Sequence, residues 1–327
     1  VNPKGQPTGL LKHLVKSLPE TIYYPDSQPK ALLDKISDAT ELASKHLALG
    51  AGSSPQIYHL FRVLRPKHTV IIGPAFSEYA QAAAAFGGKY AYVTASSEKG
   101  FEVDEAVIDL AVKQKPDLVF VANPSNPTGL LLPRQSLERL LREARKENFH
   151  VVVDEAFFDF SDGGCSAMAG VGKNSRLIVL RSLTKIYAIA GLRLAYLAGP
   201  PKFVEKFNQT SEPWSLNTLA IAAGLYCLDQ VDFIQESRAY LKRLKSQFYD
   251  LLNKYFHLYP TDVNYVLAHT KDKVGDLVDF LFDKGILVRD ASDMHGLSPG
   301  FLRLAIKPSA QIKRLVAAME DYSAGTT

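Results

Sequence analysis

The sequence has few cysteines, little net charge and no long apolar run. Cys165 and Cys227 are the only cysteines in 327 residues, which argues against a disulfide framework and favours the reducing cytoplasm. The formal net charge of +4 is too small to indicate nucleic-acid binding. The longest apolar candidate, Trp214 to Leu228, is interrupted by polar residues and falls short of the roughly 20 apolar residues that a membrane helix requires. No secretory signal is visible. We expect a cytoplasmic protein that binds neither nucleic acid nor membrane and holds no metal.

The chain otherwise has the composition of an ordinary globular protein, with 46% hydrophobic and 22% charged residues. Its length suffices for about two domains. Apolar runs alternate with helical patterns from about residue 46 to residue 200, and the runs are continuous, as in strands of a sheet covered on both faces. The expected strands are His46–Gly50, His68–Gly73, Lys89–Thr94, Asp117–Ala122, His150–Asp154, Arg176–Arg181 and Leu192–Ala198. This alternation predicts an α/β fold with a mostly parallel, seven-stranded sheet.

A second, smaller α/β domain is predicted after Gly199-Pro200-Pro201. There a helix-rich stretch is followed by short strands around a helix over Lys273–Lys284. The expected strands are Tyr265–His269, Ile286–Val288 and Phe301–Ile306. We predict a large domain over residues 24–205, and a small domain of residues 1–23 and 206–327 that includes an interdomain helix.

Lys185 directly follows a predicted strand and has polar neighbours. The hydroxyls of Ser182 and Thr184 precede it, and Arg193 comes eight residues later. A lysine so placed forms a Schiff base with an aldehyde cofactor, and hydroxyls and a guanidinium hold a phosphate dianion. A random lysine is most often an ordinary surface residue, but these neighbours favour a phosphorylated aldehyde cofactor.

Small residues precede a helical pattern in Gly50-Ala51-Gly52-Ser53-Ser54. The backbone N–H groups and the dipole of a helix N-terminus form an anion site, to which Ser53 and Ser54 add hydroxyl donors. A plain helix cap would need only one serine. We expect Gly52, Ser53 and Ser54 to enclose the phosphate together with the hydroxyls and the guanidinium around Lys185.

Two further predicted strands lead into polar side chains. Asn126 lies in Asn-Pro-Ser-Asn-Pro-Thr-Gly after one strand, and Asp154 ends the next one. Turn formation alone would account for the asparagine, whereas an ionised carboxylate at a buried strand end needs a cationic partner. Ligands on parallel sheets bind beyond the carboxyl ends of the strands, so we expect these residues to meet there.

Asparagine, aspartate, lysine and arginine in this order, each at a predicted strand end, resemble the pyridoxal-phosphate enzymes of the aspartate aminotransferase fold. The resemblance implies that pyridoxal 5′-phosphate is the cofactor. Asp154 would then face the pyridine nitrogen and keep the ring protonated as an electron sink, Asn126 would donate to the phenolic oxygen, and Phe76 would stack on the ring. The equivalent of Tyr24 reaches the phosphate of the neighbouring subunit, which implies a homodimer with shared active sites.

Several longer stretches resemble the threonine-phosphate decarboxylases of cobalamin biosynthesis. They are residues 181–193, 212–217, 288–293 and 301–307. Phe157 stands where aminotransferases usually carry a tyrosine, as it does in the decarboxylases. The resemblance implies a carboxy-lyase that converts L-threonine O-3-phosphate to aminopropanol phosphate, with Lys185 and Asp154 as catalytic residues.

Arg289 and Arg303 are the candidate clamps for the anionic groups of a phosphorylated amino-acid substrate. The planar guanidinium fork binds carboxylate and phosphate in bidentate fashion, although surface salt bridges are the ordinary alternative. The resemblance alone implies that Asn2 contacts the substrate phosphate.

Three other functions compete with the decarboxylase. Histidinol-phosphate aminotransferase, or a related class I/II aminotransferase, is the near relative. A cofactor-binding transcriptional sensor would need a helix-turn-helix module, and no basic recognition helix is visible. A structural protein with a vestigial site would have lost some of Asn126, Asp154, Lys185 and Arg193, and all four are present.

Overall fold

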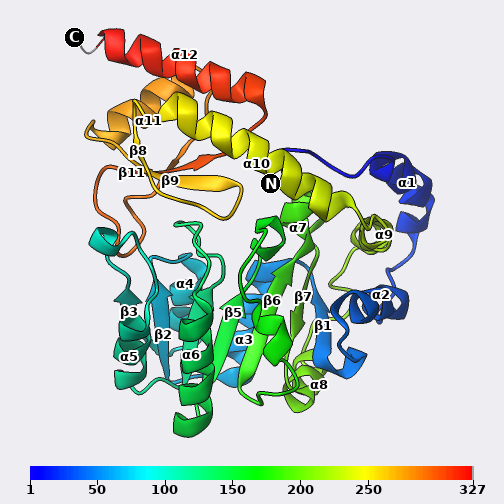
Figure 1. The fold of residues 1–327 in the computed structure, drawn as a ribbon. Helices are drawn as coiled ribbons and strands as arrows, with labels where there is room; N and C mark the ends of the chain where they lie inside the picture. Colours follow the sequence, from blue (N-terminus) through cyan, green and yellow to red (C-terminus); the bar gives the residue numbers. More distant parts are fainter. Residues whose placement is uncertain (326–327) are drawn as a thin grey trace.

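The computed structural model describes residues 1–325, which form two sheets and the helices around them (Figure 1). The larger sheet has seven strands in the order β1-β7-β6-β5-β4-β2-β3. They are β1 (Leu47–Gly50), β2 (His68–Gly73), β3 (Lys89–Thr94), β4 (Leu118–Ala122), β5 (His150–Asp154), β6 (Leu177–Ser182) and β7 (Ala195–Ala198). β7 is antiparallel to both neighbours, and the remaining pairs are parallel. The predicted α/β fold with a mostly parallel sheet is confirmed.

Helices cover both faces of this sheet, because successive strand side chains point to opposite sides. Val119 and Val151 pack in one hydrophobic cluster with residues of α5 and α6, whereas Phe120 and Val152 pack in another with residues of α3, α4 and α8. The helices are α3 (Ser53–Leu64), α4 (Glu78–Ala85), α5 (Glu105–Lys113), α6 (Arg134–Glu147) and α8 (Pro201–Gln209). Burial on both faces explains why the strands are continuous apolar runs in the sequence.

A smaller antiparallel sheet in the order β10-β11-β9-β8 lies above the large one in Figure 1. Its strands are β8 (His257–Leu258), β9 (Tyr265–His269), β10 (Arg289–Asp290) and β11 (Phe301–Ala305). The long helix α10 (Phe233–Leu252) packs against α12 (Ser309–Gly325), which also contacts α11 (Val274–Asp283). Within residues 1–325, none of the helices is both long and apolar enough to span a bilayer.

The N-terminal segment connects the second sheet with the edge of the large one. α1 (Leu10–Ser17) packs on α9 (Thr218–Leu228), which also contacts α2 (Lys30–Thr40). The carbonyl of Val1 accepts a hydrogen bond from Asn264, and the Asn2 amide donates to Ser237 on α10. The first two residues are therefore attached near β9 and α10.

Two predicted strands differ from the structure. The prediction at Ile286–Val288 is wrong: the Ile286 N–H bonds back to Leu281 at 2.8 Å to close α11, and pairing begins only at Arg289. The strand predicted over Leu192–Ala198 is shorter, because residues 190–192 form a 3-10 turn and Arg193 has a left-handed φ of 61°. The two-residue strand β8 was not predicted. At residues 286–288 the apolar run predicted a buried strand, but the Leu287 side chain is 86% exposed, so a short apolar run alone indicates neither burial nor strand pairing.

Candidate active site

A cavity of about 200 Å³ lies at the carboxyl ends of β4, β5 and β6, on the side of the second sheet. Its walls bring together most of the residues singled out by the sequence, namely Ser53, Ser54, Phe76, Asn126, Asp154, Ser182, Thr184, Lys185, Arg193 and Arg303. Tyr79, Ala122, Pro124, Ala156 and Phe157 complete the lining. The parallel topology is the reason for this convergence, since it places the carboxyl ends of neighbouring strands at one edge of the sheet.

Lys185 lies on α7 (Leu183–Ile186), a single helical turn that starts directly after β6. Its Nζ is 5.9 Å from the centroid of the Phe157 ring. Burial lowers the pKa of the Lys185 amine, and repulsion from Arg193 and Arg303 lowers it further. The negative charge of Asp154 acts in the opposite direction and raises this pKa. The amine therefore loses its proton nearer to neutral pH than an exposed lysine, as a nucleophile or general base requires.

Asp154 is the last residue of β5 and is almost fully buried. Its Oδ2 accepts a hydrogen bond from the Tyr79 hydroxyl at 2.7 Å, and its Oδ1 accepts one from the Ala156 N–H at 3.0 Å. Burial raises the pKa of the Asp154 carboxyl, whereas both hydrogen bonds and the charge of Lys185 favour its ionised form. A carboxylate held in this way at a cavity wall is suited to pair with a cationic ring nitrogen.

An anion site lies at the N-terminus of α3. The buried Oγ of Ser53 has no hydrogen-bond partner in the part of the chain that the structure describes. Gly52 has a φ of +97°, and a Cβ built on it would lie 2.5 Å from Nη2 of Arg193, so the guanidinium lies against the glycine backbone. Ser182 Oγ and Thr184 Oγ1, 2.7 Å apart, add hydroxyls to the same cavity. An unpartnered hydroxyl, a helix N-terminus and a guanidinium together fit a phosphate dianion.

Arg303 reaches the cavity from β11 of the second sheet. Its Nη1 donates a hydrogen bond to the Asn126 side-chain oxygen at 2.5 Å, and its guanidinium lies 5.3 Å from the centroid of the Tyr265 ring. The Tyr265 hydroxyl in turn donates to the Ser125 carbonyl at 2.7 Å. These contacts hold a cation in the cavity that also contains Lys185, and they connect the second sheet to the loop that follows β4.

The structure does not bring Asn2, Arg289 or Tyr24 to the cavity wall. Asn2 is buried, and its amide donates to the Ile186 carbonyl at 2.7 Å and to Ser237. Arg289 is half-exposed and is bonded to both carboxylate oxygens of Asp293, at 2.9 and 2.7 Å. Tyr24 is 81% exposed, and its ring packs on Trp214, with ring centroids 4.9 Å apart. Their proposed roles remain predictions.

Tyr79 is a polar wall residue that was not predicted from the sequence. It lies in the first turn of α4, is 1% exposed, and stacks on Phe120 with ring centroids 4.1 Å apart. Phe76, three residues earlier, meets its ring edge-on at 5.9 Å. The available signal was a lone tyrosine hydroxyl in an alanine-rich helix directly after a strand end, because a buried hydroxyl needs a partner.

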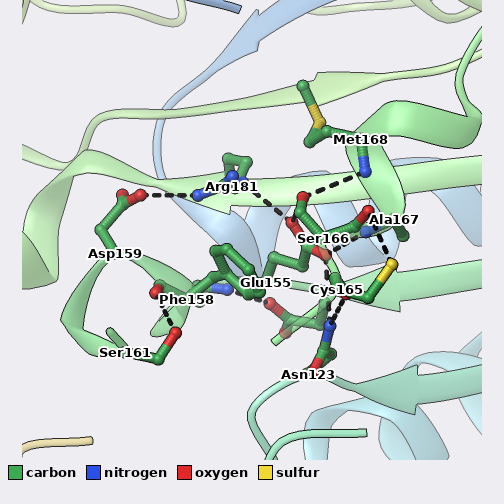
Figure 2. Close-up of polar contacts among 12 residues, drawn as sticks. Asn123, Glu155, Phe158, Asp159, Ser161, Cys165, Ser166, Ala167, Met168 and Arg181 are labelled. Atoms are coloured by element: carbon green, nitrogen blue, oxygen red, sulfur yellow. Dashed lines mark hydrogen bonds and ion pairs between the residues drawn. The ribbon is translucent and has the colours of Figure 1, made fainter. Parts of the chain in front are cut away.

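A buried polar network lies beside the site and ties the ends of β4, β5 and β6 together. Figure 2 shows Arg181 between the carboxylates of Glu155, 3.1 Å from its Nε, and Asp159, 2.7 Å from its Nη1. Glu155 also accepts hydrogen bonds from Asn123 at 3.3 Å, from the Ser166 hydroxyl at 2.7 Å and from the Ala167 N–H at 2.6 Å. Glu155 and Arg181 directly adjoin Asp154 and Ser182 in the sequence, so this network fixes the strand ends that carry the site.

Comparison with known proteins gives consistent matches over most or nearly all of the chain. The family profile described as aminotransferase class I and II matches residues 13–319. The threonine-phosphate decarboxylase of Salmonella typhimurium is 30% identical over 99% of this chain and 90% of its own length. A histidinol-phosphate aminotransferase of Caldanaerobacter subterraneus is 29% identical over 94% of this chain and 86% of its own. The crystal structure of the histidinol-phosphate aminotransferase from Clostridium acetobutylicum superposes with a TM-score of 0.91 at 25% identity, covering 99% of this chain and 98% of that one.

Proposed function

The chain belongs to the class I and II aminotransferase family, and from that premise we propose that it is a pyridoxal-phosphate-dependent decarboxylase. Its substrate would be L-threonine O-3-phosphate and its product aminopropanol phosphate, an intermediate of cobalamin biosynthesis. The observation that carries the proposal is the position of Lys185, with its lowered pKa, in one cavity with Asp154 and an anion site. The similarity to the Salmonella decarboxylase over nearly the whole chain supports the choice of substrate.

The residues of the cavity fit the cofactor at both of its ends. Ser53 supplies a buried hydroxyl that lacks a partner among the described residues, and Arg193 supplies the counter-charge for a phosphate. The Asp154 carboxylate lines the same cavity and would pair with the ring nitrogen, with Phe76 as the candidate stacking residue. When bound, pyridoxal phosphate supplies an aldehyde that joins covalently to amines and a ring that accepts the electrons of the Cα bond standing perpendicular to it.

Two residues of the chain would carry the proton transfers. Asp154 would favour a protonated ring nitrogen by remaining ionised, which its two hydrogen-bond donors support. Lys185 Nζ, with a pKa lowered by burial and by the neighbouring guanidinium groups, is suited to deliver a proton to Cα after the carboxylate has left. Both groups act from fixed positions at strand ends, which avoids reorganisation during the reaction.

Orientation of the substrate would decide between loss of carbon dioxide and loss of a proton. Arg303 faces the cavity and is the candidate clamp for a substrate anion, while Arg289 on the paired strand would have to leave Asp293 to provide a second clamp. Holding the carboxylate out of the ring plane favours decarboxylation, because the bond to it then overlaps the π system. Asn2 is retained as a proposed contact to the substrate phosphate.

Carbon dioxide release from L-threonine O-3-phosphate tests this proposal. Purified protein supplied with pyridoxal phosphate should release carbon dioxide and form aminopropanol phosphate without any 2-oxo acid. The runner-up function, histidinol-phosphate aminotransferase, predicts instead a reaction with histidinol phosphate that depends on 2-oxoglutarate. Turnover only under the second condition would overturn the decarboxylase assignment and leave the cofactor assignment standing.

We also propose a homodimer with shared active sites. The described surface carries a run of exposed apolar side chains on α1 and the segment after it, including Leu11 at 68%, Val15 at 57% and Ile22 at 78% exposure. Tyr24 and Trp214 continue this run beside a hollow of about 650 Å³ between residues 26–33 and 208–216. A second copy on this face would bury these side chains and bring Tyr24 towards its neighbour's anion site, as the family resemblance implies.

We propose a large domain over residues 24–205, which contributes all cavity residues except Arg303, and a small domain formed by the remaining residues.

Cytoplasmic location is proposed because both cysteines are free thiols.

A further inference from the structure

We propose that Tyr79 is a positioning residue that keeps the Asp154 carboxylate ionised and aimed at the ring nitrogen of the cofactor. The inference rests on the proposed pyridoxal-phosphate function and deepens it. Its basis is the 2.7 Å hydrogen bond from the Tyr79 hydroxyl to Asp154 Oδ2, between two side chains that are both buried at the cavity wall.

The position of the Tyr79 hydroxyl is fixed by packing. Its ring stacks on Phe120 of β4 with an interplanar angle of 20° and is met edge-on by Phe76. α4 holds the residue in its first turn, with Tyr79, Ala80, Ala82 and Ala83 buried against the sheet. With its side chain held on two sides, the hydroxyl has little freedom to leave Asp154.

The hydrogen bond has a definite direction. Burial raises the pKa of Tyr79 well above its ordinary value, and the neighbouring Asp154 charge adds to this shift. The phenol therefore stays protonated and donates, so the carboxylate accepts. Tyr79 occupies Oδ2 while the Ala156 N–H occupies Oδ1, which fixes the carboxylate plane and leaves lone pairs on both oxygens for a ring N–H.

Few other charged or titratable groups face Asp154. Lys185 on α7 favours the ionised carboxylate, and Tyr265 on β9 senses its charge. The paired residues on the neighbouring strands, Ala122 and Leu180, are apolar. The hydrogen bond from Tyr79 is therefore a large part of what offsets the cost of burying this carboxylate.

The consequence concerns where one proton resides. A proton shared between Asp154 and a pyridine nitrogen goes to the more basic partner. A donor on the carboxylate makes it less basic, so the proton stays on the ring and the ring remains a good electron acceptor. Without the Tyr79 hydroxyl, Asp154 would become more basic and the ring would become a weaker acceptor.

The test compares Tyr79→Phe with wild type in two measurements that do not depend on turnover. The first is the affinity of the cofactor-free protein for pyridoxamine phosphate, which has the same ring and phosphate but no aldehyde to react with Lys185, over a pH series. The second is the ¹⁵N chemical shift of ring-labelled pyridoxal phosphate bound to each protein. Tyr58→Phe is the matched control, because it also removes a tyrosine hydroxyl bonded to a carboxylate, that of Glu78 at 2.9 Å, but outside the cavity.

As the pH is lowered, the affinity of Tyr79→Phe for pyridoxamine phosphate should begin to fall at a higher pH than that of wild type. The reason is that the Asp154 carboxyl, without the Tyr79 donor, has a higher pKa and gains its proton earlier. At the acidic end of the series its dissociation constant should exceed that of wild type by roughly tenfold, the effect of one hydrogen bond to a charged group. The ring ¹⁵N signal should move towards that of neutral pyridine. Tyr58→Phe should match wild type in both measurements.

Two results would separate failure of this inference from failure of the function. If Tyr79→Phe binds the cofactor with an unchanged pH profile and ring signal, even with lowered thermal stability, Tyr79 is only a packing residue and the inference is overturned. If wild type itself binds neither pyridoxal phosphate nor pyridoxamine phosphate, the proposed function fails first.

Discussion

At the scale of single residues, the anion site depends on the absence of a side chain. Gly52 has a positive φ, and the space in which a Cβ would lie is taken by the guanidinium of Arg193. Arg193 itself adopts a left-handed φ of 61° directly after a 3-10 turn, which directs its side chain back towards α3. The contact between the two residues lets the charged group and the helix N-terminus act on one ligand.

Replacing Gly52 with alanine should therefore weaken cofactor binding. The new methyl group would displace the Arg193 guanidinium, and a residue with a Cβ is strained at this φ. We expect the dissociation constant for pyridoxal phosphate to rise by roughly tenfold or more, as measured by absorbance titration of the cofactor-free protein. Gly191→Ala is the control, since nothing lies within 4 Å of a Cβ there. Equal affinities of the two variants would contradict this picture of the anion site.

At the scale of elements, the carboxyl ends of β4, β5 and β6 are held together by charged side chains that do not line the cavity. The Glu155 side chain is fully buried, and the Arg181 side chain is 12% exposed. Burial raises the pKa of Glu155, and the Arg181 charge with the Ser166 and Ala167 donors opposes the shift. Arg238 on α10 also donates to the Asp159 carbonyl at 2.8 Å, so the network reaches from the sheet to the long helix.

Arg181→Met should be strongly destabilising, because it leaves two carboxylates without their cation in a buried setting. We expect the free energy of unfolding to fall by about 3 kcal/mol, as measured by urea denaturation of the cofactor-free protein. Arg139→Met is the comparison, since Arg139 pairs with Asp109 at the same 2.7 Å distance on the surface, where an ion pair contributes little. Equal losses in the two variants would show that the network does not hold the strand ends.

At the scale of the whole molecule, several apolar side chains of the N-terminal segment remain exposed. Leu11 and Val15 are exposed although α1 is amphipathic and buries Leu10 on its other side. Large exposed apolar patches mark interaction surfaces. Tyr24 packs on Trp214, which lines the hollow of about 650 Å³, and the proposed second subunit would cover these residues.

The protein should sediment as a dimer of its 36.0 kDa chain. Ile22→Asp would bury a charge in the proposed interface and should weaken dimerisation by roughly tenfold or more, as measured by sedimentation velocity over a concentration series. Leu287→Asp is the control, because Leu287 is as exposed, at 86%, but lies between α11 and β10. A monomeric wild type would remove the basis for shared sites.

Much of the site could be predicted from the sequence because its residues are attached to strand ends. A strand end is visible as the point where a continuous apolar run stops, and parallel topology then brings these points together without further information. Asn126, Asp154, Lys185 and Arg193 all meet at one cavity for this reason. Tyr79 could not be placed in the same way, because its role depends on which helix face turns towards β5.

The sequence by itself determined the parallel sheet, the strand-end chemistry and the likeness to pyridoxal-phosphate enzymes. These follow from local patterns of burial and residue type, which act along the chain. Only the tertiary structure decided which of two arginines, paired across β10 and β11, faces the cavity: Arg303 does, while Arg289 pairs with Asp293. It also decided that Tyr79 meets Asp154 across 75 positions of sequence, because contacts between distant segments depend on packing geometry that no local pattern contains.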